Sequence, residues 1–202
     1  MKIFAIVRNY GVPDNECCFG PGAPAWYEIP DSSLLRSGQP FFVPDFAHEF
    51  RVFPTLVYRI SRLGKGIKAR FASRYVDAMT VGACAVAVDM LDELRRKGEP
   101  WSRAVAFDKC CMLGNFSNCT DFPNEWHVRC GENELCYNHN DIQRGFPEIL
   151  ERLSRDITMK EGDIVMTALH PAGLPLSIGN KLVAYSSCMD NSSNKVLDIN
   201  IR

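Results

Sequence analysis

The sequence predicts a β-rich α+β domain with a few short helices, on three observations. Most apolar residues fall in short runs separated by Gly- and Pro-containing turns, as is typical of strands. Only a few segments carry apolar residues at helical spacing. The chain has 202 residues, 46% of them hydrophobic, so we expect one domain spanning residues 1–202 with its own core.

Each expected element rests on a local pattern. Ile67, Phe71 and Tyr75 recur at i, i+4 and i+8, the spacing of one helix face. Pro147 suits the first turn of a helix. In chain order, we expect a strand over 2–8, an irregular loop-rich segment over 11–40, a strand over 56–60, a helix over 67–75, a buried strand over 80–88 leading into a helix that stops at 98–100, a hairpin of 126–129 with 134–137, a helix from 147, a strand over 164–167 and a strand pair from 178 onward.

Composition excludes several classes of function. The 23 basic and 24 acidic residues give a formal net charge of −1, so no nucleic-acid or membrane partner is indicated. The apolar run over residues 3–7 is too short for a signal peptide, and no run reaches the roughly 20 residues of a membrane span. The nine cysteines, without an export signal, predict reduced thiols and a cytoplasmic protein.

Several segments occur in one order that resembles the fumarylacetoacetate hydrolase family, specifically a short bacterial-type member. The resemblance covers most of residues 3–185. Its motifs are Val7-Arg8-Asn9-Tyr10, Pro30-Asp31-Ser32-Ser33-Leu34-Leu35, the segment from Pro44-Asp45-Phe46 through Leu56 to Gly64-Lys65, Tyr75 to Leu91, Lys97-Gly98-Glu99-Pro100-Trp101, Ala106-Phe107-Asp108, Glu161-Gly162-Asp163-Ile164-Val165-Met166-Thr167 and Ile178-Gly179-Asn180-Lys181-Leu182.

The resemblance implies a mixed β-roll that is usually a homodimer. It also implies a Mg²⁺, Mn²⁺ or Ca²⁺ ion that holds adjacent substrate oxygens and stabilises enolate charge. Such enzymes hydrolyse, tautomerise or decarboxylate small oxo acids. Lysine and arginine side chains hold the substrate carboxylates, and a histidine or glutamate near the N-terminal motif activates water.

The metal-ligand positions of this family have lost their carboxylates here. The glutamate pair falls on Phe53 and Thr55, in a register that Leu56 and the following Gly64-Lys65 fix. The metal-binding aspartate falls on Cys84, which is a soft ligand or simply a small buried side chain. Hard cations want anionic oxygen ligands, so no metal cofactor is expected.

Other pocket positions have changed in the same direction. The pocket lysine falls on Val105 and the substrate-contacting threonine on Leu169, while Asp108 survives. An uncompensated buried charge is costly, so the loss of one ligand favours neutralisation of the others. The remaining replacements implied by the resemblance are Pro13 for the N-terminal base, Ile29 for a lysine and Val88 for an arginine.

These losses predict a pseudoenzyme, or a scaffold that binds a small molecule or a protein. It is expected to be a homodimer, or a mixed dimer with an active paralogue. The alternative is an active hydrolase, isomerase or decarboxylase of small oxo acids with a relocated or metal-free site. That alternative predicts a deep polar pocket containing Asp108, Asp89 or Glu49, whereas the first hypothesis predicts that Phe53 fills the space.

Three other constellations stay open at this stage. Zinc favours Cys and His, although no Cys-x-x-Cys pair is present. A cysteine nucleophile among Cys17, Cys18, Cys110 and Cys111, with His170 as base, would need a lowered pKa. The basic residues Arg59, Arg62, Lys65 and Lys68 form an anion site or, more simply, a solvated edge. The candidate zinc ligands are Cys119, His127, Cys130, Cys136 and His139.

Overall fold

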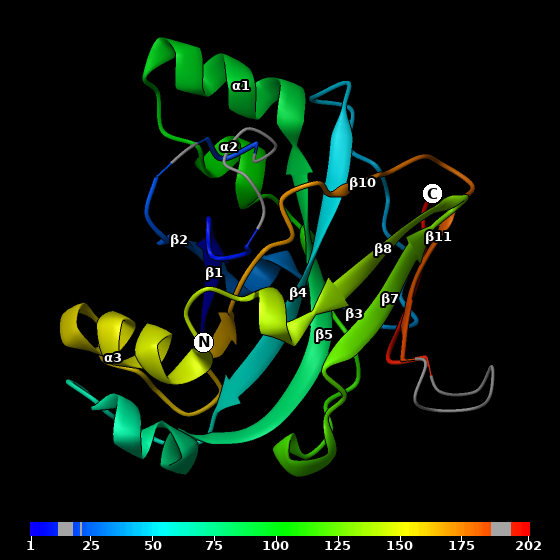
Figure 1. Cartoon of the computed structure of the whole chain (residues 1–202). Coiled ribbons are helices and arrows are strands. Elements are labelled where there is room, and N and C mark those ends of the chain that lie inside the picture. The colour runs from blue at the N-terminus through cyan, green and yellow to red at the C-terminus, as the bar shows by residue number, and fades with distance from the viewer. Residues whose placement is uncertain (12–17, 21, 187–194) are drawn as a thin grey trace.

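A computed structural model describes residues 1–11, 18–20, 22–186 and 195–202. Within these residues, the fold consists of two sheets with helices at their margins (Figure 1). The strands are β1 (Lys2–Val7), β2 (Ala25–Pro30), β3 (Leu34–Arg36), β4 (Phe50–Ile60), β5 (Val76–Ala87), β6 (Cys111–Leu113), β7 (Glu125–Cys130), β8 (Asn133–Asn138), β9 (Ile164–Met166), β10 (Leu174–Pro175), β11 (Lys181–Tyr185) and β12 (Leu197–Asn200).

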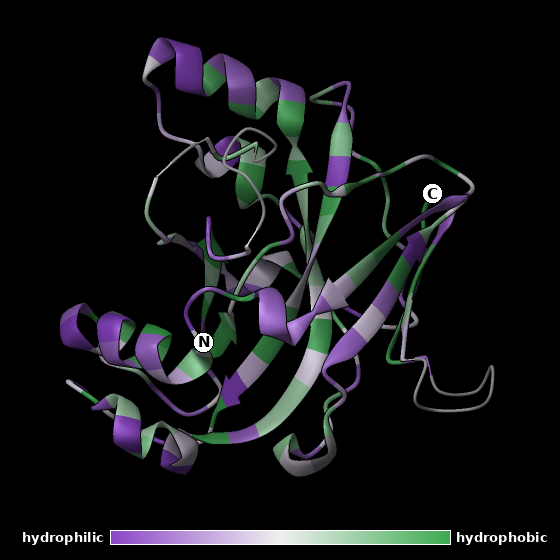
Figure 2. Ribbon diagram, in the orientation of Figure 1, coloured by the Kyte–Doolittle hydropathy of each residue, from purple (hydrophilic) through white to green (hydrophobic). Residues whose placement is uncertain are grey.

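The larger sheet runs in the order β2-β1-β9-β4-β5-β6-β3, with β10 also paired to β4. It is mixed, because β1 is parallel to β9 and β3 is parallel to β6, while β4 and β5 are antiparallel. The long β4–β5 pair is the centre of the domain and is buried along most of its length. Figure 2 shows these two strands as mainly hydrophobic. The expected β-rich α+β fold is therefore confirmed.

Pro54 lies in the interior of β4, where a residue without an N–H is normally excluded. The Pro54 carbonyl accepts a hydrogen bond from the His170 N–H at 2.8 Å, so this residue directs its backbone groups away from β5. The β4–β5 ladder consequently loses no donor at Pro54. The same geometry ties the loop after β9 to the middle of β4.

The smaller sheet has the order β12-β11-β7-β8 and contains the predicted hairpin. Strands β7 and β8 are antiparallel, and Gly131 turns between them with a φ of 62°, which favours glycine. Trp126, Val128 and Tyr137 are buried on its inner face. This sheet packs its apolar face toward the larger one, and Tyr137 donates a hydrogen bond to the Ala168 carbonyl at 2.8 Å.

The described residues include three α-helices: α1 (Val88–Lys97), α2 (Ser102–Val105) and α3 (Phe146–Asp156). Helix α3 packs on one face of the larger sheet, where Phe146 stacks on Tyr58 of β4 and Arg152 lies over the Trp26 ring of β2. Alternating colours along α1 and α3 in Figure 2 show that both are amphipathic. Helix α1 ends at Gly98 in the left-handed conformation, a common helix stop. No helix among the described residues is long and apolar enough to cross a membrane.

Three expectations about elements were wrong. Residues 25–36 are not irregular, because β2 and β3 lie there, and β2 pairs along its whole length with β1. Residues 69–75 form a 3₁₀ helix rather than an α-helix, held to α3 by the Glu151 carboxylate, which accepts from the Ala69 N–H at 2.9 Å. Strand β4 starts at Phe50, so Phe53-Pro54-Thr55 lies inside the strand and not before it.

Candidate functional site

The three positions at which the resemblance implies metal ligands lie on one face of the sheet. Phe53 lies directly opposite Cys84, and Thr55 lies opposite Gly82, across β4 and β5. Residues directly opposite in antiparallel strands point to the same face, so all of these side chains share the inner face. Met166 of β9 joins that face through its pairing with Val57.

Phe53 occupies the interior at this place and is 1% exposed. Its ring packs against Gly173, where an added Cβ would lie 2.6 Å from the ring and where φ is +61°. Phe19 contacts the other side, with ring centroids 5.9 Å apart. Phe53 therefore fills this space, as the first hypothesis predicts.

Thr55 is fully buried, and its hydroxyl forms hydrogen bonds with backbone groups. The hydroxyl donates to the Leu56 carbonyl at 3.1 Å and accepts from the Ala168 N–H at 3.2 Å. Together with Tyr137, which bonds the Ala168 carbonyl, it fixes the loop that follows β9. Thr55 is therefore a structural anchor for this loop.

Cys84 is fully buried among other sulfur atoms. Its thiol lies 3.4 Å from the Met166 sulfur, and the Cys111 thiol lies 3.7 Å from the same sulfur. Hydrogen bonding with Cys111 and burial raise the pKa of the Cys84 thiol well above its usual value. Cys84 is thus a neutral thiol when no ion is bound.

The other predicted pocket residues, Val105, Leu169 and Asp108, do not form a polar pocket. Val105 ends α2 and Leu169 follows β9, and both are buried. Asp108 is an exposed turn residue. The deep polar pocket expected around Asp108, Asp89 or Glu49 is not formed by these three, since Glu49 is also exposed and Asp89 accepts from the His48 N–H at the start of α1.

These residues do not fit a hard divalent ion. The three positions offer an aromatic ring, a hydroxyl already bonded twice, and a thiol, none of which is an anionic oxygen. Among the described residues, no group of three or more His, Cys, Asp or Glu side chains is placed to hold a metal. The candidate zinc ligands Cys119, His127, Cys130, Cys136 and His139 are therefore not brought together in the part of the chain described.

Cys130 and Cys136, the two cysteines of the hairpin, do not face each other. Cys130 pairs with Asn133, while Cys136 pairs with His127 on the opposite face. The Cys110 and Cys111 thiols are buried, and Cys111 lies in β6 rather than in a loop. Burial raises the pKa of the Cys110 thiol, so it is no activated nucleophile. Cys17 lies outside the described residues.

The predicted basic edge is largely ion-paired. Arg59 forms two hydrogen bonds of 2.9 Å with Asp77, and Lys68 pairs with Glu151. Lys65 donates to the Asp156 carbonyl. A solvated edge explains these residues, and the anion site is not supported.

A polar group that the sequence did not single out lies beside Phe53. Arg51 is on the same face, two residues earlier in β4, and donates from Nη1 to the Ala172 carbonyl at 3.1 Å. Its Nε is buried and has no hydrogen-bond partner among the residues that the structure describes. A buried, unpaired guanidinium nitrogen is costly to leave unsatisfied and matches the geometry of a carboxylate.

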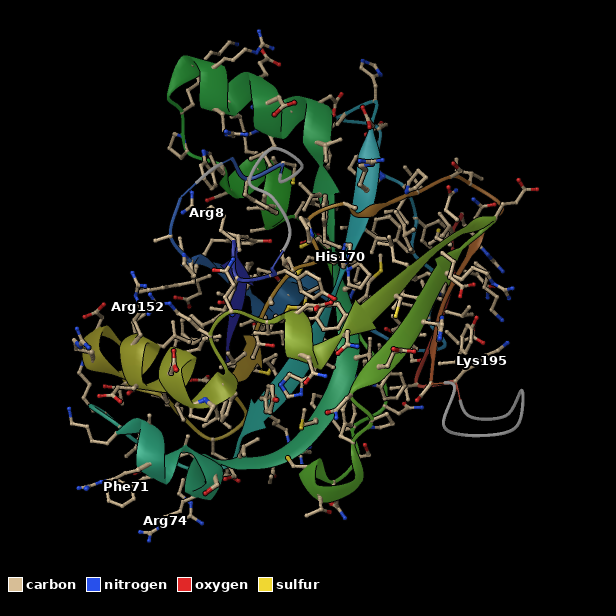
Figure 3. All side chains as sticks on the ribbon, in the orientation of Figure 1. Arg8, Phe71, Arg74, Arg152, His170 and Lys195 are labelled. Atoms are coloured by element: carbon tan, nitrogen blue, oxygen red, sulfur yellow. The ribbon has the colours of Figure 1, made fainter. Side chains whose placement is uncertain are left out.

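His170 and Arg51 both form a hydrogen bond with the backbone of Ala172. The His170 Nδ1 accepts from the Ala172 N–H at 3.3 Å, which places the proton of the neutral ring on Nε2. Burial lowers the pKa of His170 to about 4, and the charge of Asp141 raises it only in part. Figure 3 shows His170 in the middle of the molecule. His170 is therefore an uncharged hydrogen-bond donor at neutral pH.

Tyr10 links His170 to Asp141. The Tyr10 and His170 rings lie 4.8 Å apart, and the Tyr10 hydroxyl donates to Asp141 Oδ2 at 3.2 Å. Burial raises the pKa of Tyr10 to about 12, so the phenol keeps its proton. The arrangement groups a cation, a neutral imidazole, a phenol and a carboxylate around the loop that follows β9.

Sequence reasoning missed Arg51 for a physical reason. A single arginine in a strand is an ordinary surface residue unless the register places it inside, and the register came only from the structure. His170 was noted as a candidate base, but its neutral form depends on burial that no local pattern shows.

The family comparison agrees with the resemblance of the motifs. The family model described as "Fumarylacetoacetate (FAA) hydrolase C-terminal" matches residues 2–171. The chain is 29% identical over 185 residues to the mitochondrial oxaloacetate tautomerase fahd-1 of Caenorhabditis elegans, covering 86% of this chain and 83% of that protein. It is 26% identical over 189 residues to the mitochondrial oxaloacetate decarboxylase of Dictyostelium discoideum, covering 88% and 83%.

Solved structures show the same fold. Fumarylpyruvate hydrolase from Pseudomonas aeruginosa, solved with Mn²⁺ and pyruvate, has a TM-score of 0.86 and 18% identity, covering 100% of this chain and 89% of that one. The 5-carboxymethyl-2-hydroxymuconate delta-isomerase from Mycobacterium smegmatis has a TM-score of 0.81 and 21% identity, covering 99% and 78%. By motif order, by family model and by fold, the chain belongs to the fumarylacetoacetate hydrolase family.

Proposed function

We propose that this protein binds small oxo acids and interconverts their keto and enol forms without a carboxylate-held metal. The observation that carries the proposal is the buried, unpaired Nε of Arg51, next to a loop that also holds His170. Relatives named as an oxaloacetate tautomerase and an oxaloacetate decarboxylase support an oxo acid as the substrate class.

Each residue has a role that its environment favours. Arg51 holds a substrate carboxylate, because its unpaired Nε–H can donate a charge-assisted hydrogen bond to a carboxylate oxygen. His170 donates its Nε2 proton as a hydrogen bond to the carbonyl oxygen, where negative charge develops as the enol forms. Asp141, bonded to Tyr10, removes the proton from the carbon beside the carbonyl. Because Asp141 is exposed, it returns this proton to solvent, and the enolate oxygen takes up one proton from solvent to give the enol.

A second candidate function is binding without turnover, as a pseudoenzyme or scaffold. Phe53 favours it, because its ring fills the place of an inherited ligand and contacts Phe19 and Gly173. In this case Arg51 still binds a carboxylate, but no reaction follows. Both candidates therefore predict oxo-acid binding and differ only in catalysis.

The test is the rate at which oxaloacetate interconverts between keto and enol forms, measured with excess chelator present. We expect acceleration over buffer that the chelator leaves unchanged. Binding seen by calorimetry without acceleration supports the second candidate. Neither binding nor acceleration, or activity that disappears with chelator and returns with Mn²⁺, overturns the proposal.

A further inference from the structure

Three sulfur atoms meet at the inherited metal position. The Cys84 and Cys111 thiols both contact the Met166 thioether, at 3.4 and 3.7 Å. All three residues are fully buried. They come from three separate strands, β5, β6 and β9, so the tertiary fold, and not a local turn, brings them together.

The sheet register holds the two thiols close to each other. Cys84 lies directly opposite Cys111. The flanking hydrogen bonds, from Ala85 N–H to the Cys110 carbonyl and from Gly114 N–H to the Val81 carbonyl, make this a non-hydrogen-bonded pair. In such pairs the Cα atoms are only about 4.5 Å apart and the side chains are closest. The two thiols and the thioether therefore form a compact triangle.

We propose that Cys84, Cys111 and Met166 form a three-sulfur site for one soft monovalent ion, Cu(I). Thiolate and thioether ligands select Cu(I) over hard cations. With metal–sulfur bonds of about 2.3 Å, a trigonal site places its sulfurs about 4 Å apart. The observed separations of 3.4 and 3.7 Å are about 0.6 and 0.3 Å shorter than that value, so the three sulfurs must move apart by about half an ångström to admit the ion.

The neighbouring Tyr27 hydroxyl is an independent indication. Tyr27 pairs with Ala5, and Ala5 with Met166, which places Tyr27 on the same inner face. Its hydroxyl is buried and makes no well-formed hydrogen bond among the described residues, but it lies close enough to the Cys84 thiol to interact with it. Two thiolates and one Cu(I) leave one negative charge, and a phenol that donates to a thiolate sulfur stabilises such a charge. The Tyr27 hydroxyl, which already faces the neutral Cys84 thiol, donates to a charged sulfur once the ion is bound, and such a hydrogen bond is stronger.

Zinc does not fit this triangle. Zinc takes four ligands from Cys, His or carboxylates in structural sites, and a thioether is not among them. The described residues place no third Cys, His, Asp or Glu with the two thiols. The ligand set therefore favours Cu(I), and binding replaces two S–H protons, which leave to solvent, with no change in oxidation state.

The experiment must load the ion while the chain folds, because all three sulfurs are enclosed. The full chain is refolded anaerobically with Cu(I) and then challenged with the Cu(I) chelator bicinchoninate. We expect one Cu(I) retained per chain, with sulfur-only coordination in X-ray absorption. The amount of Cu(I) retained per chain after the chelator challenge should fall at least tenfold in Cys84→Ala and in Cys111→Ala. Met166→Leu, which conserves volume, should weaken retention at least tenfold while the far-ultraviolet circular dichroism stays unchanged.

Cys130→Ala is the matched control, because Cys130 is equally buried but lies in the smaller sheet. It should retain one Cu(I). The proposal is overturned if the natural chain, refolded to its native circular dichroism, retains no copper. It is equally overturned if Met166→Leu retains copper as tightly as the natural chain, since the Met166 sulfur is then not a ligand and the three-sulfur site does not exist.

Discussion

Phe53 and Cys84 lie directly opposite each other on β4 and β5, with both side chains in the core. These are two of the positions at which the resemblance implies metal ligands, and neither carries a carboxylate. The β4–β5 register that brings them together extends from Phe50 to Ile60, with a shift only between Arg59 and Ile60.

Hard divalent ions should leave the stability of the natural chain unchanged. Mn²⁺ and Mg²⁺ stabilise only a state that binds them, and the three positions offer no carboxylate. We expect the Tm, followed by circular dichroism, to be the same with and without Mn²⁺ at millimolar concentration. The triple variant Phe53→Glu, Thr55→Glu, Cys84→Asp places three carboxylates on one face, so its Tm should rise with Mn²⁺. An equal rise in the natural chain would show that a hard-metal site is still present.

Thr55→Val should destabilise the fold although it changes almost no volume. The Thr55 hydroxyl accepts from the Ala168 N–H, and its removal leaves that buried donor without a partner. The expected loss in the free energy of unfolding is about 1–3 kcal/mol. Urea denaturation measures it, with the exposed Thr158→Val as control, for which about 0.5 kcal/mol or less is expected. Equal effects in the two variants would rule out the anchoring role of Thr55.

Arg51→Met should weaken oxo-acid binding about 10- to 100-fold. A hydrogen bond to a charged group contributes about 1.5–3 kcal/mol, and Arg51 has a buried Nε free to make one. Methionine keeps the apolar stem and removes the guanidinium. Calorimetric titration with oxaloacetate gives the Kd, and the exposed Arg129→Met on β7 is the control. If both variants bind like the natural chain, the carboxylate is held elsewhere.

The fold could be predicted from the sequence where a pattern is local or where a register is anchored. The hairpin around Gly131 and the buried strand leading into α1 carried their own turn and cap signals. Strand β2 carried no such signal. It is an edge strand in which Ile29 is the one buried residue, so its sequence lacks a strong alternation of apolar and polar residues. For the site, the sequence shows that Phe53 and Cys84 carry no carboxylate. The contacts of the three sulfur atoms and the unpaired Arg51 Nε depend on strands that are distant in the sequence, so no local pattern predicts them.

The pH dependence of stability should report on His170. Its pKa in the folded chain is about 4, against an ordinary value of 6.5, because burial disfavours the charged ring. Between pH 6.5 and 4 the unfolded chain takes up a proton that the folded chain does not, so the free energy of unfolding falls as the pH drops through this window and is unaffected by His170 above it. Thermal unfolding at pH 7.5, 5.5 and 4.5 should show that His170→Gln loses less stability on acidification than the natural chain. The control His48→Gln, at an exposed position, should lose as much stability on acidification as the natural chain. If His170→Gln also loses as much stability as the natural chain, His170 is not buried as a neutral ring.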